Sequence, residues 1–187
     1  MAITRDNIEE VLIVPSIRDL LTYDCGLLEK KLKEESINHK LAVYLENHLS
    51  CIPTRVKFTV DVEYDKYIDV QKTMQVDGKE FIARPDILIH KRFTNKHNLL
   101  ALEAKKRSIS LRDEQKLRGF LDYDYHYRFG LMITYGIPET NYIRYVLLYR
   151  EQHPPVFSKT VYIYKDGKLK IKNDWNVFIA RNAQNGG

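Results

Sequence analysis

The sequence predicts an α/β fold in which helices flank one mixed β-sheet. Apolar residues recur at helical spacing in the first fifty positions, and apolar runs typical of strands follow them. One amphipathic segment separates two of these runs, which indicates a helix between two strands. The resulting order of helices, three strands, a helix and further strands is typical of a mixed central sheet covered by helices. Because 44% of the 187 residues are hydrophobic, we expect a single domain over residues 1–187.

Two helices are expected before the first strand. The segment IRDLLTYDCG predicts a short helix that begins after Pro15–Ser16 and ends near Gly26. A longer helix is expected over residues 27–49, ending before Pro53, because apolar and amphipathic side chains recur there with helical periodicity. These side chains belong to Ile37, Leu41, Tyr44, Leu45 and His48.

Three strands and a connecting helix are expected next. The alternating segment KFTVDVEY (57–64) predicts the first strand. FIARPDILIH (81–90) and LLALEAK (99–105) predict the second and third strands, on either side of the polar loop 91–98. Ser108 or Ser110 can cap the helix predicted over residues 111–125, whose first turn is acidic, as a helix dipole favours.

The C-terminal third is expected to add strands to the sheet. FGLMITYG (129–136) and YIRYVLLYR (142–150) have the apolar character of buried strands. VYIYKDGKLKIK (161–172) predicts two alternating strands joined by a tight turn at Asp166–Gly167.

Chemistry-bearing side chains gather at the end of the third predicted strand. Glu103 and Lys105 are two residues apart, so both project from the same face of the sheet. If His90 and Leu99 close the hairpin, paired residue numbers add to 189 and Asp86 lies opposite Glu103. Two carboxylates placed so closely repel each other unless one is protonated or a cation lies between them.

A hard divalent cation suits this pair of carboxylates. Mg²⁺ takes oxygen ligands and is commonly held by one or two carboxylates and a substrate phosphate, and we expect Mn²⁺ to substitute for it. Lys105 would add a positive charge that steadies developing negative charge or orients an attacking water. These parts together indicate metal-dependent phosphodiester hydrolysis.

The motifs Arg84-Pro85-Asp86 and Glu103-Ala104-Lys105 resemble those of the PD-(D/E)XK nuclease superfamily, which has the restriction-endonuclease-like fold. The resemblance implies an αβββαβ core over about residues 27–135, with the N-terminal helix and the C-terminal strands and hairpin as additions. It implies that Asp86 and Glu103 bind Mg²⁺, that the Ala104 carbonyl is a further ligand, and that Lys105 is catalytic.

Members of this superfamily often supply a further metal-binding glutamate from the first core helix. Glu34 and Glu35 are the candidates. At 100° per residue, Glu34 lies about 60° from Ile37 on the apolar side of the helix, whereas Glu35 lies about 160° away. We therefore expect Glu34 to reach the metal, with a solvated acid beside the helix as the alternative. Glu63 on the first strand is a further candidate acid.

Basic residues follow the Glu103–Lys105 motif. Residues 103–118 contain six basic and three acidic residues, and the whole chain has a net charge of +5 and a pI near 9.0. This balance permits a polyanionic partner, so DNA is the expected substrate and RNA the alternative. The residues expected to contact nucleic acid are Lys106, Arg107, Arg112, Gln115 and Lys116.

The sequence therefore predicts a Mg²⁺-dependent DNA endonuclease of the restriction, defence or repair type. The alternatives are a nucleic-acid-binding module that does not cleave and a protein-interaction domain on the same fold. A homodimer or a partner protein is expected where both strands of a duplex are cut. No apolar run is long enough to span a membrane, the N-terminus does not resemble a secretory signal, and Cys25 and Cys51 lack metal-ligand spacing, so we expect a cytoplasmic protein with reduced thiols.

Overall fold

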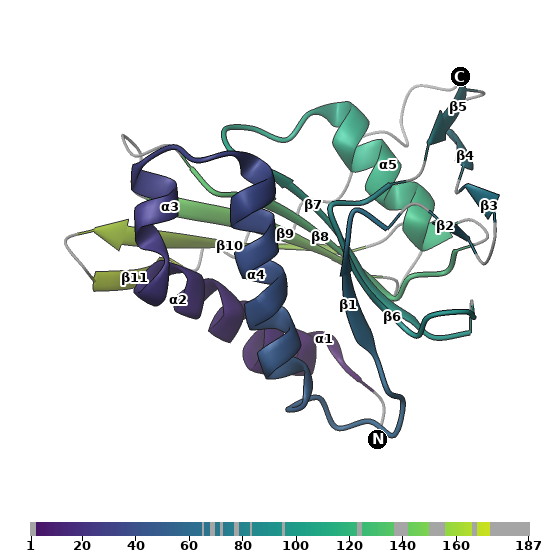
Figure 1. The fold of residues 1–187 in the computed structure, drawn as a ribbon, viewed down its shortest axis with the longest axis horizontal. Helices are drawn as coiled ribbons and strands as arrows, with labels where there is room; N and C mark the ends of the chain where they lie inside the picture. The colour runs from purple at the N-terminus through teal and green to yellow at the C-terminus, as the bar shows by residue number, and fades with distance from the viewer. Residues whose placement is uncertain are drawn as a thin grey trace.

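The structure is a computed structural model that describes most of the chain. The described residues are 3–64, 66–67, 70–71, 73–76, 79–82, 84–94, 96–122, 125–136, 142–149, 156–165 and 168–172. Helices lead, a run of strands follows, and one helix interrupts the strands (Figure 1). The helices are α1 (Arg5–Ile8), a π-helical turn η1 (Glu9–Ile13), α2 (Val14–Tyr23), α3 (Cys25–Glu29), α4 (Glu34–Leu49) and α5 (Leu111–Asp122).

A seven-stranded mixed sheet forms the centre of the molecule, in the order β1-β6-β7-β8-β9-β10-β11. Neighbouring strands are antiparallel except β7 and β8, which are parallel and are joined by the crossover helix α5. The strands of this sheet are β1 (Thr59–Val62), β6 (Ile87–His90), β7 (Asn98–Lys105), β8 (Phe129–Thr134), β9 (Tyr142–Tyr149), β10 (Val156–Lys165) and β11 (Lys168–Lys172). The prediction of a mixed sheet with helices is confirmed.

Four short strands between β1 and β6 form two separate ribbons. β2 pairs with β3 and β4 pairs with β5, and neither pair joins the main sheet. These strands are β2 (Lys66–Tyr67), β3 (Val70–Gln71), β4 (Thr73–Val76) and β5 (Lys79–Ile82).

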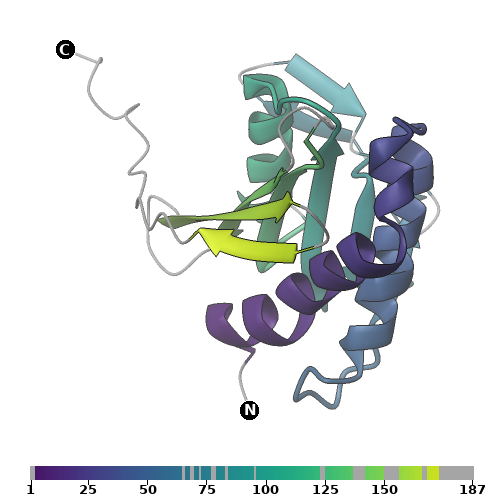
Figure 2. The same cartoon turned by 90° about the vertical axis from the view of Figure 1, so that its left-hand side faces the viewer.

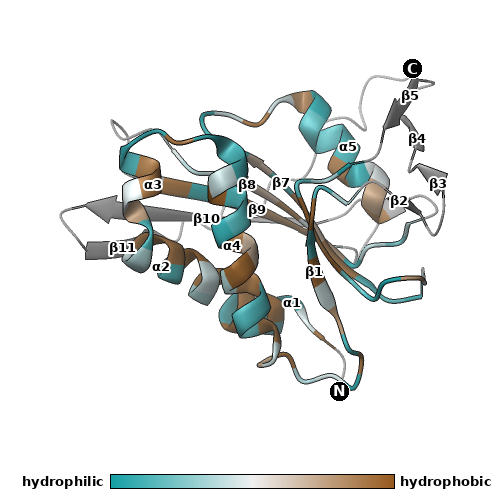
Figure 3. Cartoon of the chain, viewed as in Figure 1, coloured by the Kyte–Doolittle hydropathy of each residue, from teal (hydrophilic) through white to brown (hydrophobic). Residues whose placement is uncertain are grey.

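Apolar side chains cover both faces of the sheet, because strand residues alternate between the faces and each helix has an apolar side. Helices α1 to α4 lie on one face and α5 lies on the other (Figure 2). Ile87 and Leu102 belong to the cluster under α1 to α4, whereas Leu88 and Ala101 belong to the cluster under α5, because successive strand residues point to opposite faces. The hydropathy colouring shows the apolar strands between the more hydrophilic outer surfaces of α4 and α5 (Figure 3).

The predicted helix over residues 27–49 is wrong as one continuous element. The helix is interrupted between α3 and α4, where Lys31 has a φ of 54°. The amides of Lys31 and Leu32 donate to the carbonyls of Leu28 and Leu27, which is the hydrogen-bond pattern of a Schellman motif that ends a helix. The usual sequence signal for this ending is a glycine, and here a lysine takes its place.

The predicted strand over residues 81–90 is also divided. Its first part belongs to β5, and its second part is β6, after Pro85. Proline has no amide hydrogen to donate to a sheet, which explains the break between the two strands. The pairing of His90 with Leu99 is wrong as well, since a bulge after Ile89 pairs His90 with Asn98.

The first predicted helix is wrong at its start, because α1, η1 and α2 make the chain helical from Arg5 instead of from the residue after Ser16. Strands β2 to β4 were not predicted.

The remaining predicted elements lie close to their expected positions. Ser110, rather than Ser108, caps α5, because its hydroxyl accepts the amide of Asp113 and the Asp113 carboxylate accepts the amide and hydroxyl of Ser110. β10 and β11 form the predicted C-terminal hairpin, and its turn at Asp166–Gly167 lies outside the described residues. No helix among the described residues has the length and apolar character of a membrane-spanning segment.

Candidate active site

The candidate site lies where β6 begins and β7 ends, between the N-terminal turns of α4 and α5. Ile87 pairs with Leu102, and this register brings Asp86 opposite Glu103, as the alternation predicts. The Asp86 amide donates to the Leu102 carbonyl at 3.0 Å, and the Asp86 Oδ2 atom accepts the Ala104 amide at 2.7 Å. The Asp86 carboxylate is therefore fixed at the edge of β7 by a charge-assisted hydrogen bond.

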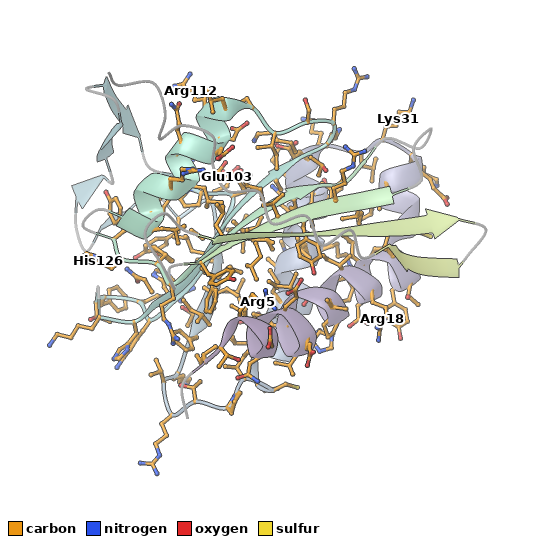
Figure 4. All side chains as sticks on the ribbon, turned by 180° about the vertical axis from the view of Figure 1, so that it is seen from behind. Arg5, Arg18, Lys31, Glu103, Arg112 and His126 are labelled. Atoms are coloured by element: carbon orange, nitrogen blue, oxygen red, sulfur yellow. The ribbon has the colours of Figure 1, made fainter. Side chains whose placement is uncertain are left out.

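Glu103 is the most deeply buried carboxyl of the group. Its side chain is 1% exposed, because it has the same strand parity as Ala101 and so points under α5 (Figure 4). Lys116 of α5 forms an ion pair with Glu103 Oε1 and also donates to the Arg84 carbonyl at 2.6 Å. Lys116 thus connects the buried carboxyl to the segment that carries Asp86.

Burial dominates the protonation of Glu103. The pKa of Glu103 is raised from 4.5 to about 7, chiefly by removal from water and also by the nearby Asp86 carboxylate, while Lys116 and Lys105 act to lower it. Desolvation disfavours the charged form, and one flexible ammonium offsets that cost only in part. The Glu103 carboxyl is therefore protonated below neutral pH. A further cation nearby would stabilise its charged form.

Lys105 lies between two carboxylates that come from different elements. Its Nζ atom is 3.6 Å from Glu34 Oε1 and 3.9 Å from Asp86 Oδ2. Partial burial lowers the pKa of Lys105, but Asp86, Glu34 and Glu103 together raise it above its ordinary value. The side chain is therefore an ammonium at neutral pH, suited to electrostatic stabilisation and not to proton abstraction.

Glu34 is brought to the site by the N-terminal turn of α4. Besides its contact with Lys105, its Oε2 atom accepts the Lys106 amide at 2.9 Å. Glu35, the other candidate on this helix, is exposed. The choice of Glu34 over Glu35 from helical angles therefore agrees with the geometry. Glu63, the further candidate acid, has an exposed side chain that is 3.9 Å from Arg84.

The Ala104 carbonyl points toward the same edge as Asp86. The Lys105 carbonyl accepts the Tyr135 amide at 2.9 Å, on the side of β8. Because successive carbonyls along a strand point in opposite directions, the carbonyl of Ala104 points to the other side, where its own amide contacts Asp86. One backbone oxygen and three carboxylates thus lie around the end of β7.

These oxygen donors suit a hard cation such as Mg²⁺ in chemical type. Asp86, Glu103 and Glu34, with the Ala104 carbonyl, are the residues that would hold it. As the side chains stand, the ammonium groups of Lys105 and Lys116 contact these carboxylates. Within the described ranges, no three histidine, cysteine or acidic side chains form a group that could hold a metal ion as they stand.

The residues expected to contact nucleic acid do not all face outward. Lys106 donates to the Lys31 carbonyl at 3.3 Å, and Lys116 points inward to Glu103. Arg107 and Arg112 are exposed beside the site, and Gln115 is half-buried on α5. Arg107 and Arg112 are therefore the two cations of this set that are oriented toward solvent.

Two structural features of the site have no signal in the sequence. One is the inward direction of Lys116, which depends on how α5 crosses the sheet. The other is a buried hydrogen bond from the Tyr135 hydroxyl to Asn38 Oδ1 at 2.6 Å, which ties α4 to the end of β8 one helical turn from Glu34. Burial raises the pKa of Tyr135, so its hydroxyl remains a donor at neutral pH.

Comparison of the chain with protein-family models, with curated proteins and with solved structures gave no match.

Proposed function

We propose that this chain is a Mg²⁺-dependent nuclease of the PD-(D/E)XK type, with DNA as its expected substrate and RNA as the alternative. Asp86, Glu103 and Lys105 are its proposed catalytic residues, and Glu34 and the Ala104 carbonyl are the further proposed metal ligands. The observation that carries the proposal is the convergence of Glu34, Asp86 and Lys105 at one end of the sheet, next to Glu103.

The order of the elements supports the restriction-endonuclease-like core. Helix α4, strands β1, β6 and β7, helix α5 and strand β8 follow the αβββαβ order that the sequence resemblance implies. β1, β6 and β7 are successive antiparallel neighbours, and β8 is parallel to β7. In this arrangement β2 to β5 are an insertion between the first two core strands, and β9 to β11 extend the sheet.

Each residue has a distinct proposed task. Bound Mg²⁺ would supply Lewis-acid activation of water and neutralisation of phosphate charge. Asp86 and Glu103 would hold the ion through carboxylate oxygens, and the Glu103 side chain is 1% exposed. The Lys105 ammonium, fixed beside Asp86 and Glu34, donates hydrogen bonds to the phosphate and orients the attacking water.

Calorimetric titration of Mg²⁺ and Mn²⁺ into the full chain tests the proposed ligands. We expect saturable binding by the wild-type protein and loss of binding by Asp86→Asn. Asp19→Asn is a matched control, because Asp19 is a half-buried carboxylate that contacts His48 on the helical face at 2.7 Å. Equal binding by the wild type and Asp86→Asn, or no binding by the wild type in the presence of DNA, would refute the proposed site and favour a binding module that does not cleave.

A further inference from the structure

The hairpin that joins β6 to β7 is here called the basic hairpin, and the structure describes its residues 91–94, 96 and 97. It carries an exposed aromatic ring. Phe93 is 80% exposed and has a φ of 62°. This left-handed conformation favours glycine, and a bulky side chain rarely adopts it. Strained backbone conformations of this kind concentrate at functional contacts, so the hairpin is a candidate ligand-binding element.

Exposed cations lie on the same hairpin as this ring and on a neighbouring segment. Lys91, Arg92 and Lys96 of the basic hairpin are exposed, and residues 91–97 include no acid. The pairing of Thr59 with His90 brings the segment before β1, which includes two further exposed cations and no acid in residues 53–58, to the same end of the sheet. These two cations are Arg55 and Lys57.

Only one of these five cations forms an ion pair with a described residue. The Arg92 guanidinium binds both carboxylate oxygens of Asp61, and Asp61 also contacts His90 at 2.8 Å. Arg92 therefore fixes the base of the hairpin. No ion pair involves the remaining four cations within the part of the chain that the structure describes, so their charge is directed toward solvent.

We propose that the basic hairpin, with Arg55 and Lys57, binds a single-stranded segment of nucleic acid. The cations contact successive phosphates, and Phe93 stacks on a base. A phenyl ring has no hydrogen-bonding group and stacks on any base, and base faces are accessible only where strands are unpaired. Four exposed cations that form no ion pair with a described residue match a polyanion. This inference deepens the proposed function, because it assigns a substrate contact away from the catalytic residues.

The basic hairpin and the candidate active site lie at opposite ends of the same strands. Asp86 precedes β6 and Glu103 lies near the end of β7, whereas the hairpin joins the other ends of both strands (Figure 1). Phe93 is seven positions after Asp86, and seven residues at the rise of a β-strand extend about 23 Å. At the spacing of stacked nucleotides, about 3.4 Å, roughly seven nucleotides span this distance.

Fluorescence anisotropy with a labelled single-stranded thymidine oligonucleotide of about 20 nucleotides, in EDTA, tests the stacking contact. We expect the dissociation constant of Phe93→Gly to rise about tenfold with an unchanged salt dependence, since stacking is not ionic. Glycine relieves the positive φ, so the urea midpoint of this variant should not fall, and weaker binding cannot be attributed to unfolding. Phe93→Tyr should restore binding. Tyr23→Ala, at an aromatic ring that is 73% exposed on α2, should bind normally.

The same titration at several salt concentrations tests the phosphate contacts. We expect Lys91→Ala/Lys96→Ala to reduce the slope of log affinity against log salt by about 1.4, which is about 0.7 for each phosphate contact of a single strand. Arg18→Ala/Lys30→Ala is the matched control, since Arg18 lies on the outer surface of the helical layer (Figure 4). Its slope should equal that of the wild type.

Three outcomes would overturn this inference. One is unchanged binding by both hairpin variants, and another is the absence of oligonucleotide binding by the wild type. The third is preferential binding to phosphatidylserine vesicles that Phe93→Gly abolishes, which would identify the hairpin as a membrane-surface contact. The proposed function fails separately: binding through the hairpin without metal-dependent cleavage would refute the nuclease and leave the docking site standing.

Discussion

At the scale of single residues, Glu103 links the protonation of the site to the stability of the fold. Its pKa is raised from 4.5 to about 7, chiefly by burial. Between these values the folded protein holds a proton that the unfolded chain releases. The free energy of unfolding should therefore fall as pH rises through this window and level off above about pH 7, with a total change of about 3 kcal/mol.

Urea unfolding of the wild type and Glu103→Gln from pH 4 to pH 8 measures this dependence. The variant cannot titrate at this position, so its free energy of unfolding should increase relative to that of the wild type as pH rises from about 4.5 to 7. Glu114→Gln, on the same face of α5 as Arg118, with which Glu114 pairs, should follow the wild-type pH profile. Parallel profiles for the wild type and Glu103→Gln would show that Glu103 has an ordinary pKa.

Lys105 should affect catalysis and metal binding in opposite directions. Lys105→Met removes the proposed donor to the phosphate, so we expect cleavage to slow by about 10²- to 10³-fold. It also removes the ammonium between Glu34 and Asp86, so the affinity for Mn²⁺ should rise. Single-turnover cleavage and calorimetry on the same preparation measure both quantities. A variant that loses metal affinity together with activity would contradict this role.

The positions of individual site residues could be predicted from the sequence where local periodicity controls them. Strand alternation gave the shared face of Glu103 and Lys105, and helical angles favoured Glu34 over Glu35. The direction of Lys116 could not be predicted, because it depends on the packing of α5 on the sheet, which no local pattern encodes.

At the scale of secondary-structure elements, the buried Tyr135–Asn38 hydrogen bond holds α4 against the end of β8. Tyr135→Phe leaves the Asn38 side-chain oxygen buried without this donor, so the free energy of unfolding should fall by about 1–3 kcal/mol. The variant should also bind metal more weakly, since Glu34 lies one helical turn from Asn38.

Urea unfolding and Mn²⁺ titration of Tyr135→Phe measure these two effects. Tyr23→Phe is the control, because the Tyr23 side chain is exposed and the loss of its hydroxyl should not change the free energy of unfolding. Wild-type stability in Tyr135→Phe would mean that the tie between α4 and β8 contributes nothing.

The types of the larger elements could be predicted, because apolar periodicity determines them. The helical segment before Val14, the short strands β2 to β4 and two internal boundaries could not be predicted. The helix break at Lys31 has no glycine to mark it, although its backbone adopts the positive φ and the hydrogen bonds of a Schellman motif. The break between β5 and β6 is marked by Pro85, but the continuous apolar character of the segment favoured one strand. The register needed only the pairing of Ile87, Leu88 and Ile89, and the bulge at His90 left it intact at the site.

At the scale of the whole molecule, metal binding should stabilise the fold. A ligand that binds only the folded state at a hundred times its dissociation constant adds about 2.7 kcal/mol. For a chain of this size we therefore expect the unfolding temperature to rise by about 5–10 °C in saturating Mn²⁺. Differential scanning fluorimetry should show this rise for the wild type and Asp19→Asn, but not for Asp86→Asn. An equal rise in all three proteins would indicate that the metal binds elsewhere.

At the scale of the whole molecule, the two proposed sites also lie at opposite ends of one sheet. The candidate catalytic residues lie at one end of β6 and β7, and the basic hairpin lies at the other. The sequence indicated the first end through its motifs, and it gave the second as a polar loop only. The exposure of Phe93 and its left-handed backbone are properties of the folded hairpin that composition does not reveal.

Cleavage of supercoiled plasmid and of single-stranded DNA by the purified chain, in Mg²⁺ or Mn²⁺ and in EDTA, tests the central claim most directly. We expect metal-dependent cleavage by the wild type and Asp19→Asn, and its loss in Asp86→Asn, Glu103→Gln and Lys105→Met. Cleavage that persists in Asp86→Asn, or the absence of cleavage of either substrate by a wild type that binds both metal and DNA, would contradict the account.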